Sequence, residues 1–345
     1  MTILFSCAGR RNYLLRYFKE VVGETGTIIA VDSDPTASAF SDADIGLQVP
    51  SVNDSEYLST LENIVSEYHV DMLIPLNDWE LFTISSYREQ FENLGTRVVV
   101  SSPEIVQTFT DKWQTYQFFK KIGLNTPETY LSLKDVEEAL NQKKIKFPLV
   151  LKPRVGSGSI NVMIANGWEE LKIVHRLLSS SMKFLNKENG ILIQEKIVGI
   201  EYGMDILNDF EGKYFGSYVR KKIAMRCGET DKAISVIEER FDRLAKDISK
   251  ATQHIGSIDC DFFVVGDKVS FLEINPRFGG GYPFSHQAGV NIPALYCSWY
   301  EGCSDFQKYN RYTAGLTFAK CSRVVQIQKK KETHRVMVNK EKSSI

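Results

Sequence analysis

The chain has 345 residues, long enough for two or three packed subdomains and too long for one ordinary core. Its hydrophobic fraction of 43% and charged fraction of 25% are those of a globular protein and exclude global disorder. The formal net charge of −1 gives no strong field toward nucleic acid or membrane, so neither is expected as a partner.

The cysteine pattern and the N-terminal sequence indicate the cellular compartment of the protein. None of the six cysteines forms a C-x-x-C pair or a Cys/His cluster with zinc spacing, so we expect free thiols in a reducing compartment. The sequence shows no signal-peptide pattern and no apolar run of about 18 residues. We therefore expect a cytoplasmic protein.

The first part of the chain alternates strand and helix signals. Strands are expected at 2–6, 27–31, 72–75 and 97–100, and helices at 12–22, 58–68 and 80–94. This alternation predicts an α/β domain with a doubly wound parallel sheet, ending near residue 102. Only Gly9 is present where a dinucleotide fingerprint needs three glycines, which disfavours a nicotinamide-dependent oxidoreductase.

The second part of the chain has a different pattern of helix and strand signals. A helix is expected at 110–123, with Thr110 as its N-cap and Gly123 as its stop. From Pro127 onward hairpin signals dominate, interrupted by helices near 168–182 and 235–254, and segment 258–275 reads as strand, turn, strand. The tail after Gln328 is basic and weakly patterned, which is typical of a solvated terminus.

The first chemical motif is a lysine followed by a glycine and serine loop. A buried strand delivers Lys152, and the loop Gly156, Ser157, Gly158 and Ser159 follows directly. Glycines let backbone N–H groups approach phosphate oxygens, serines add donors, and the lysine adds a positive charge. The lysine precedes the glycines, so this is not a P-loop. An ordinary hairpin turn with a surface lysine is the alternative.

The second motif links a strand to an acidic residue. An apolar strand from Gly190 runs into Glu195, Lys196 and Ile197, and Glu201 follows. The backbone of such a segment can bind an adenine edge, and Glu201 can accept hydrogen bonds from ribose hydroxyls. A solvated acidic loop is the alternative.

The third motif is the most informative. Side chains alternate along a strand, so Glu273 and Asn275 share a face. A two-residue turn at 266–267 would pair Cys260 with Glu273. We favour a three-residue turn at 266–268, which pairs Val265 with Val269, Phe263 with Phe271, and Asp261 with Glu273.

That register places two carboxylates opposite each other, which is unfavourable unless a cation lies between them. A hard cation bound by carboxylate and amide oxygens removes the conflict. Arg277 follows and can bind a phosphoryl or carboxylate group through its planar fork. The alternative is a solvated polar sheet face.

Taken together, the order of these motifs resembles the ATP-grasp superfamily, and within it the carbamoyl-phosphate-synthetase-like ligases. The likeness covers about residues 1 to 295. It implies an α+β ATP-grasp architecture with a two-lobed ATP-grasp domain. Its expected parts are a Rossmann-like pre-ATP-grasp domain at 1–108, a linking helix at 109–125, a small lobe or lid at 126–190, a large lobe with the metal site at 191–328, and a basic tail at 329–345.

The resemblance also implies roles for residues. For ATP it implies phosphate contacts by Lys112 (which follows Asp111), Lys152 and the loop Gly156, Ser157, Gly158 and Ser159, adenine contacts by Glu195, Lys196 and Ile197, and a ribose contact by Glu201. The implied magnesium ligands are Asp261, Glu273 and Asn275. Arg277 would lie beside the transferring phosphate, and Arg226 in a segment near the γ-phosphate.

The N-terminal domain is expected to contact the substrate. Arg10 and Arg11 precede a helix, where charge and dipole together favour an anion. Asp32 ends the second strand, and Asn77 and Asp78 follow another strand. Ordinary capping and surface charge explain these five residues equally well.

The expected function is an ATP-dependent ligase that activates a carboxylate as an acyl phosphate and joins it to an amine. The cofactor would be one or two Mg²⁺ ions, with Mn²⁺ as a substitute, the partners would be a small-molecule carboxylate and amine, and family analogy suggests a homodimer. One alternative is a subunit of a split carbamoyl-phosphate-type synthetase. Another is a non-catalytic ATP-binding module. Complete carbamoyl phosphate synthesis is not expected, because the chain holds one ATP unit and no glutaminase-like segment.

Overall fold

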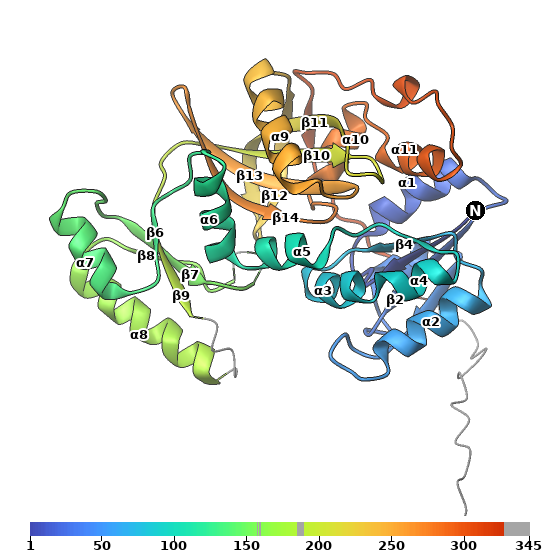
Figure 1. The fold of residues 1–345 in the computed structure, drawn as a ribbon, viewed down its shortest axis with the longest axis horizontal. Helices are drawn as coiled ribbons and strands as arrows, with labels where there is room; N and C mark the ends of the chain where they lie inside the picture. Colours follow the sequence, from blue (N-terminus) through green and yellow to red (C-terminus); the bar gives the residue numbers. More distant parts are fainter. Residues whose placement is uncertain (157, 159, 185–189, 328–345) are drawn as a thin grey trace, which may run out of the picture.

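The structure is a computed structural model that describes residues 1–156, 158, 160–184 and 190–327. Within these residues three β-sheets carry helices packed on their faces (Figure 1). Two serines of the predicted phosphate loop, Ser157 and Ser159, lie outside the described residues, and so does the predicted basic tail at 329–345.

The N-terminal domain is built on a parallel sheet of order β3-β2-β1-β4-β5. Its strands are β1 (Thr2–Ser6), β2 (Thr27–Asp32), β3 (Ile45–Gln48), β4 (Met72–Pro75) and β5 (Arg97–Val98). Alternation along β1 sends Ile3 and Phe5 to the face covered by α1 (Asn12–Val22), whereas Leu4 faces α2 (Tyr57–Glu67) and α3 (Asp78–Ser86). The predicted doubly wound sheet is confirmed.

Several predicted helices have different boundaries in the structure, and the helix expected near 235–254 is limited to Glu239–Thr252. The helix expected at 80–94 is divided at Tyr87 into α3 and α4 (Arg88–Asn93). The helix expected at 110–123 follows α5 (Pro103–Thr110) and is α6 (Lys112–Lys121). Thr110 as its N-cap was wrong: the Asp111 carboxylate accepts from the backbone N–H of Trp113 instead. Strand β3 and the 3-10 helix η1 (Ser38–Asp42) were not predicted.

A second, antiparallel sheet of order β6-β9-β7-β8 forms the small lobe. Its strands are β6 (Thr129–Tyr130), β7 (Leu149–Pro153), β8 (Met163–Ala165) and β9 (Ile191–Glu195), and its helices are α7 (Leu133–Asn141) and α8 (Trp168–Phe184). Leu149, Leu151 and Leu171 belong to a core of its own. The predicted lobe boundary at residue 190 would assign strand β9 to the large lobe. In the structure β9 pairs within the small-lobe sheet.

The large lobe is built on an antiparallel sheet of order β14-β13-β10-β11-β12-β15. The strands are β10 (Ile200–Asn208), β11 (Tyr214–Arg226), β12 (Glu229–Val236), β13 (Ser257–Val265), β14 (Lys268–Asn275) and β15 (Thr317–Ala319). Helix α9 (Glu239–Thr252) buries Phe241, Ala245 and Ile248 against this sheet. The remaining helices are α10 (Tyr282–Gln287), α11 (Ile292–Tyr300) and the 3-10 helix η2 (Gln307–Tyr309).

The large lobe and the N-terminal domain share one hydrophobic core. Phe18 of α1 contacts the rings of Phe278 and Tyr296, which lie in the C-terminal part of the chain. Figure 1 shows α1, α10 and α11 side by side, at the end of the molecule away from the small lobe. No helix among the described residues is both long and apolar enough to cross a membrane.

Candidate functional site

The β13–β14 hairpin places the predicted metal ligands together, but by a different register from the one expected. The turn has two residues, Gly266 and Asp267, and Gly266 takes the positive φ of 58° that such a turn requires. A β-bulge then leaves Leu272 without a partner and restores Asp261 opposite Glu273. The predicted three-residue turn was therefore wrong, and the predicted Asp261–Glu273 pair is confirmed.

The other predicted pairs in this hairpin were also wrong. Phe271 pairs with Phe262 instead of Phe263, and Val269 pairs with Val264 instead of Val265. Asp259 lies opposite Asn275, so that carboxylate and amide groups occupy two successive pairs on one face of the hairpin, at the end away from its turn.

A lysine that was not predicted lies among these carboxylates. Nζ of Lys222, on β11, is 2.7 Å from Asp261 Oδ1 and 2.7 Å from Glu201 Oε1. Burial works against the charge of Lys222, but Asp261 and Glu201 outweigh it and raise its pKa. Burial, Asp259 and Glu273 raise the pKa of Asp261 to about 7 despite Lys222. Lys222 therefore connects the predicted ribose-binding glutamate to a predicted metal ligand.

Two further lysines approach Glu273 from the small lobe and from α6. Lys152, at the end of β7, is buried, and desolvation lowers its pKa to about 8; Glu273 counteracts this shift and Lys112 adds to it. Nζ of Lys112 donates to the carbonyl oxygen of Gly156. Lys152 therefore lies close enough to Lys112 and to Glu273 to interact electrostatically with both.

Asp111 and Arg154 fix the start of α6 against the phosphate loop. The Arg154 guanidinium contacts both carboxylate oxygens of Asp111, with Nη2 2.6 Å from Oδ2. The backbone N–H of Lys112 donates to the carbonyl oxygen of Arg154 at 3.0 Å. These contacts hold Lys112 beside the strand that delivers Lys152. The role of Arg154 was not predicted.

Arg277 is held by the N-terminal domain. Its Nη2 donates to Asp78 Oδ2 at 2.7 Å, across 199 residues of sequence. Burial opposes the charge of Arg277, and Asp78 outweighs it and raises the pKa. The Nε of Arg277 is buried and has no hydrogen-bond partner among the described residues. This unpaired donor is suited to an anionic group of a ligand.

Two of the three glycines after Arg277, Gly279 and Gly281, make room for a buried ion network. Arg220 contacts Asp205 at 2.7 Å and Asp259 at 2.5 Å. A Cβ on Gly281 would lie 2.2 Å from Arg220 Nε, and one on Gly279 would lie 2.3 Å from Asp259 Cγ. The glycines thus let the chain after Arg277 pass directly over this network, which sequence reasoning did not identify.

The predicted γ-phosphate segment meets the phosphate loop. Arg226 is exposed and lies opposite Glu229 at the end of the β11–β12 hairpin. A Cβ on Gly228, at the tip of this hairpin, would lie 2.6 Å from the carbonyl oxygen of Gly158. The tip therefore touches the loop that was expected to close over the phosphates.

The predicted adenine segment connects the two lobes. Glu195 ends β9 in the small-lobe sheet, and Lys196 and Ile197 lead to β10 of the large-lobe sheet. The backbone N–H of Glu195 donates to the carbonyl oxygen of Glu128 at 2.9 Å.

Of the predicted substrate residues, Asp32 and Asn77 have local structural partners. Asp32 accepts from the backbone N–H groups of Gly9 at 2.8 Å and Asp34 at 2.9 Å. Asn77 caps α3 in a capping box with Glu80.

The two arginines before α1, which were also predicted to bind substrate, differ from each other in their surroundings. Arg11 Nη1 donates to the hydroxyl of Tyr13 at 2.7 Å, and Arg10 is exposed.

One pocket gathers much of this chemistry. It is lined by Asp78, Trp79, Phe109, Thr110, Lys112, Val155, Gly156, Glu273, Ile274 and Asn275. A larger cavity of about 600 Å³ lies elsewhere, beside Arg97, Phe210 and Trp299, and none of its described lining residues is a predicted site residue. We place the site in the pocket that Glu273 lines, because Lys112 and the oxygen-bearing side chains of Glu273 and Asn275 converge there.

The donor set fits a magnesium nucleotide. Asp261, Glu273 and Asn275 offer the carboxylate and amide oxygens that Mg²⁺ prefers, and Mg²⁺ keeps open positions for phosphates and water. No cluster of three or more His, Cys, Asp or Glu side chains that could hold a metal occurs among the described residues. Two carboxylates and one amide leave positions that phosphate oxygens and water would fill.

Comparisons with known proteins identify the family of the chain. The ATP-grasp domain family model matches residues 109–281, half of the chain, and the model of a PylC-like N-terminal domain matches residues 3–99. The chain is 22% identical to the carbamoyl phosphate synthase large chain of Rubrobacter xylanophilus over 60% of this chain and 20% of that protein. It is 24% identical to the formate-dependent phosphoribosylglycinamide formyltransferase of Wigglesworthia glossinidia brevipalpis, over 72% and 63% respectively.

The fold is similar to that of a solved carboxylase domain. The biotin carboxylase domain dimer of Hydrogenobacter thermophilus 2-oxoglutarate carboxylase, in complex with MgADP, ADP and bicarbonate, superposes with a TM-score of 0.70 at 19% identity. The match covers 92% of this chain and 73% of that one. The chain spans less than two thirds of the length of each of the two curated relatives named above.

Proposed function

Because the chain belongs to the ATP-grasp family, we propose that it is a ligase that uses ATP and Mg²⁺ to activate a carboxylate as an acyl phosphate and then joins it to an amine. The observation that carries this proposal is the convergence of Lys112, Glu273 and Asn275 in one pocket between the lobes. The relatives include a carbamoyl phosphate synthase and a formate-dependent formyltransferase, and these two names leave the acid and amine of this chain to be identified.

The chain's own residues supply charge and position for phosphoryl transfer, which needs little covalent chemistry from the protein. Lys152 and Lys112 would bind phosphate oxygens of ATP beside the Gly156 loop. Asp261, Glu273 and Asn275 would hold Mg²⁺, which when bound neutralises charge on the phosphates. Arg277, oriented by Asp78, would donate from its unpaired Nε to the transferring phosphoryl group or to the acid.

The reaction then has two balanced steps. A carboxylate oxygen attacks the γ-phosphorus, the bond to the β–γ bridging oxygen breaks, and ADP leaves. The amine nitrogen attacks the acyl carbon, the carbon–oxygen bond to phosphate breaks, and the nitrogen loses a proton. Contact between Gly228 and Gly158 would help the loop exclude water from the acyl phosphate.

The test is a screen for ADP and phosphate release with ATP and Mg²⁺ against small acids, each with and without amines. We expect release to require both an acid and an amine, and Glu273→Gln to abolish it while the far-UV circular dichroism spectrum stays unchanged. Release with an acid alone would support a carbamate-type kinase instead. ATP binding without turnover on any acid and amine pair would support a non-catalytic module.

A homodimer is a separate part of the proposal. The biotin carboxylase domain above is described as a dimer, and light scattering on the purified chain checks whether this chain forms one.

A further inference from the structure

A C-terminal strap, residues 316–323, crosses from the large lobe to the N-terminal domain. Its strand β15 pairs with β12, with Ala319 opposite Lys232 and Thr317 opposite Ile234. The backbone N–H of Lys320 then donates to the carbonyl oxygen of Asp231 at 2.8 Å. The strap therefore runs along the edge of the large-lobe sheet beside the strand that carries Glu229.

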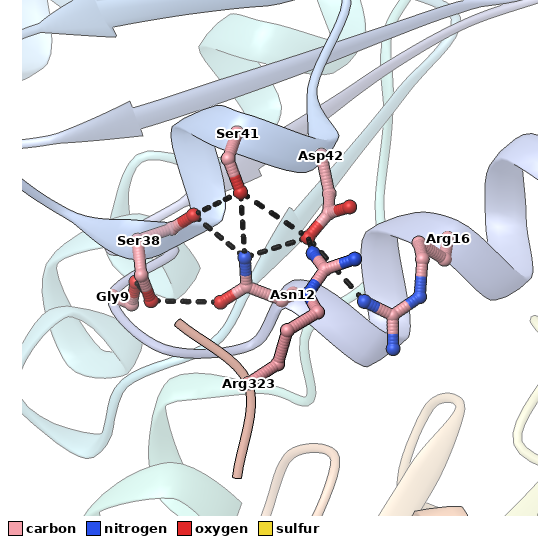
Figure 2. A network of polar contacts seen from close by, with 7 residues as sticks. All are labelled: Gly9, Asn12, Arg16, Ser38, Ser41, Asp42 and Arg323. Carbon is pink, nitrogen blue, oxygen red and sulfur yellow. Dashed lines mark hydrogen bonds and ion pairs between the residues drawn. The ribbon is translucent and has the colours of Figure 1, made fainter. Parts of the chain in front are cut away.

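The far end of the strap is anchored on the N-terminal domain. Arg323 contacts the Asp42 carboxylate, which also accepts from Asn12 Nδ2 at 2.7 Å and lies 3.4 Å from Arg16 Nη1 (Figure 2). Asn12 is the first residue of α1 and directly follows Arg11. The anchor thus lies next to the two arginines that were expected to bind substrate.

Between these two ends the strap carries Lys320, a third cation besides Arg10 and Arg11. Lys320 Nζ lies 2.8 Å from Glu229 Oε2. A Cβ built on Gly280 would lie 3.4 Å from Glu229 Cδ and 3.5 Å from Arg11 Nη1, so these groups face one another across Gly280. Burial acts to raise the pKa of Glu229, but Lys320, Arg11 and Arg10 outweigh burial and lower this pKa. Gly280 follows Arg277 by three residues, which places this cluster beside the proposed reaction site.

The cluster of Arg10, Arg11, Lys320 and Glu229 has more positive than negative charges. Arg10, Arg11 and Lys320 are cationic, and Glu229 is the carboxylate on which they act. Among the described residues, Arg10 has no ion pair, whereas Arg277 nearby is already paired with Asp78. An anion that approached Gly280 would meet a surplus of two positive charges.

We propose that Lys320, together with Arg10 and Arg11, binds a second anionic group of the acid substrate, so that the enzyme prefers acids with two anionic groups. This inference rests on the proposed ligase function, since it takes the first carboxylate to lie at Arg277. Lys320 is then a specificity-determining residue supplied by the C-terminal strap. A second carboxylate and a phosphate share the required chemistry, and the test separates them.

The test measures binding by isothermal titration calorimetry to the full chain saturated with ADP and Mg²⁺, using succinate, 3-phosphoglycerate and acetate as probes. We expect succinate or 3-phosphoglycerate to bind at least about tenfold more tightly than acetate, and the better of the two identifies the second group. Lys320→Met should weaken that binding about tenfold and leave acetate unchanged, and Lys320→Arg should restore it. The matched control is Lys308→Met, which removes an exposed lysine paired with Asp305 at 3.6 Å, away from the strap.

Several outcomes would overturn the inference. They are equal binding of all three acids, no binding of any acid to the wild-type protein, equal weakening of dianion and acetate by Lys320→Met, or an effect of Lys320→Met no larger than that of Lys308→Met. Failure of the chain to bind ADP and Mg²⁺ at all would instead overturn the proposed function, so the two failures are distinguishable.

Discussion

At the scale of single residues, Lys222 explains how the carboxylates of Glu201 and Asp261 can lie close together in the site. Its ammonium group is 2.7 Å from both Glu201 and Asp261. Sequence reasoning predicted that Asp261 and Glu273 need a nearby cation, and it considered only a metal ion. It could not identify Lys222, because Lys221 and Lys222 are adjacent and only the pairing of β11 with β10 decides which of them faces the carboxylates.

We expect Lys222→Met to lower the free energy of unfolding by about 2 to 3 kcal/mol, because it leaves two partly buried carboxylates without their cation. Lys221→Met is the matched control, since successive strand residues point to opposite faces. Urea denaturation of both variants measures the difference. Equal destabilisation by the two substitutions would show that the ion pairs of Lys222 do not stabilise the fold.

Lys152 predicts a pH dependence of stability in the ligand-free protein. Its folded pKa of about 8 lies below the ordinary lysine value of 10.5, so between these values the unfolded chain binds more protons and stability rises with pH. From pH 7.5 to 9.5 the wild-type protein should gain about 2 kcal/mol relative to Lys152→Met. The measurement is urea denaturation of both proteins at the two pH values. A constant difference would mean that the pKa of Lys152 is not lowered.

At the scale of elements, the β13–β14 hairpin shows where sequence reasoning reaches its limit. Matching apolar side chains gave the correct Asp261–Glu273 pair through an incorrect turn. The true register combines a two-residue turn with a bulge at Leu272, and a bulge leaves little signal in the pattern of polar and apolar residues. By contrast, α1 begins and ends where its periodicity predicted, because Leu14, Leu15 and Phe18 mark its buried face clearly.

The tip of the β11–β12 hairpin gives a prediction for loop closure. Gly228 and Gly266 both occupy two-residue turns with positive φ, but only Gly228 touches the phosphate loop at Gly158. Each change to alanine should cost about 1 kcal/mol of stability through the strained backbone. Only Gly228→Ala should also raise the KM for ATP, by about tenfold, because the added Cβ displaces the loop. Steady-state kinetics with equal KM values in both variants would contradict the proposed contact.

At the scale of the whole molecule, the hydrophobic cores divide the small lobe from the rest of the described chain. The N-terminal domain and the large lobe share a core through Phe18, Phe278 and Tyr296, whereas the small lobe has its own core around Leu151. The order of the parts could be read from the motifs along the chain. The shared core could not, because it joins α1 to helices that lie more than 250 residues later.

We expect this separation to appear in hydrogen exchange. Amides of β7 and β9 should exchange at a lower free energy of opening than those of β1 and β13 in the ligand-free protein, because the small lobe has a separate core. A non-hydrolysable ATP analogue with Mg²⁺ should protect β7 and β9 more than β1. Uniform protection of all four strands before and after ligand addition would contradict an independently moving small lobe.

We propose that Asp261, Glu273 and Asn275 hold a divalent ion beneath the terminal phosphates of ATP. The most direct measurement is a crystal structure of the chain with a non-hydrolysable ATP analogue and Mg²⁺. We expect oxygens of Glu273 and Asn275 about 2.1 Å from the metal, with the triphosphate between Lys112 and Lys152. A triphosphate bound outside this pocket, or a metal with no ligand from β14, would contradict the account.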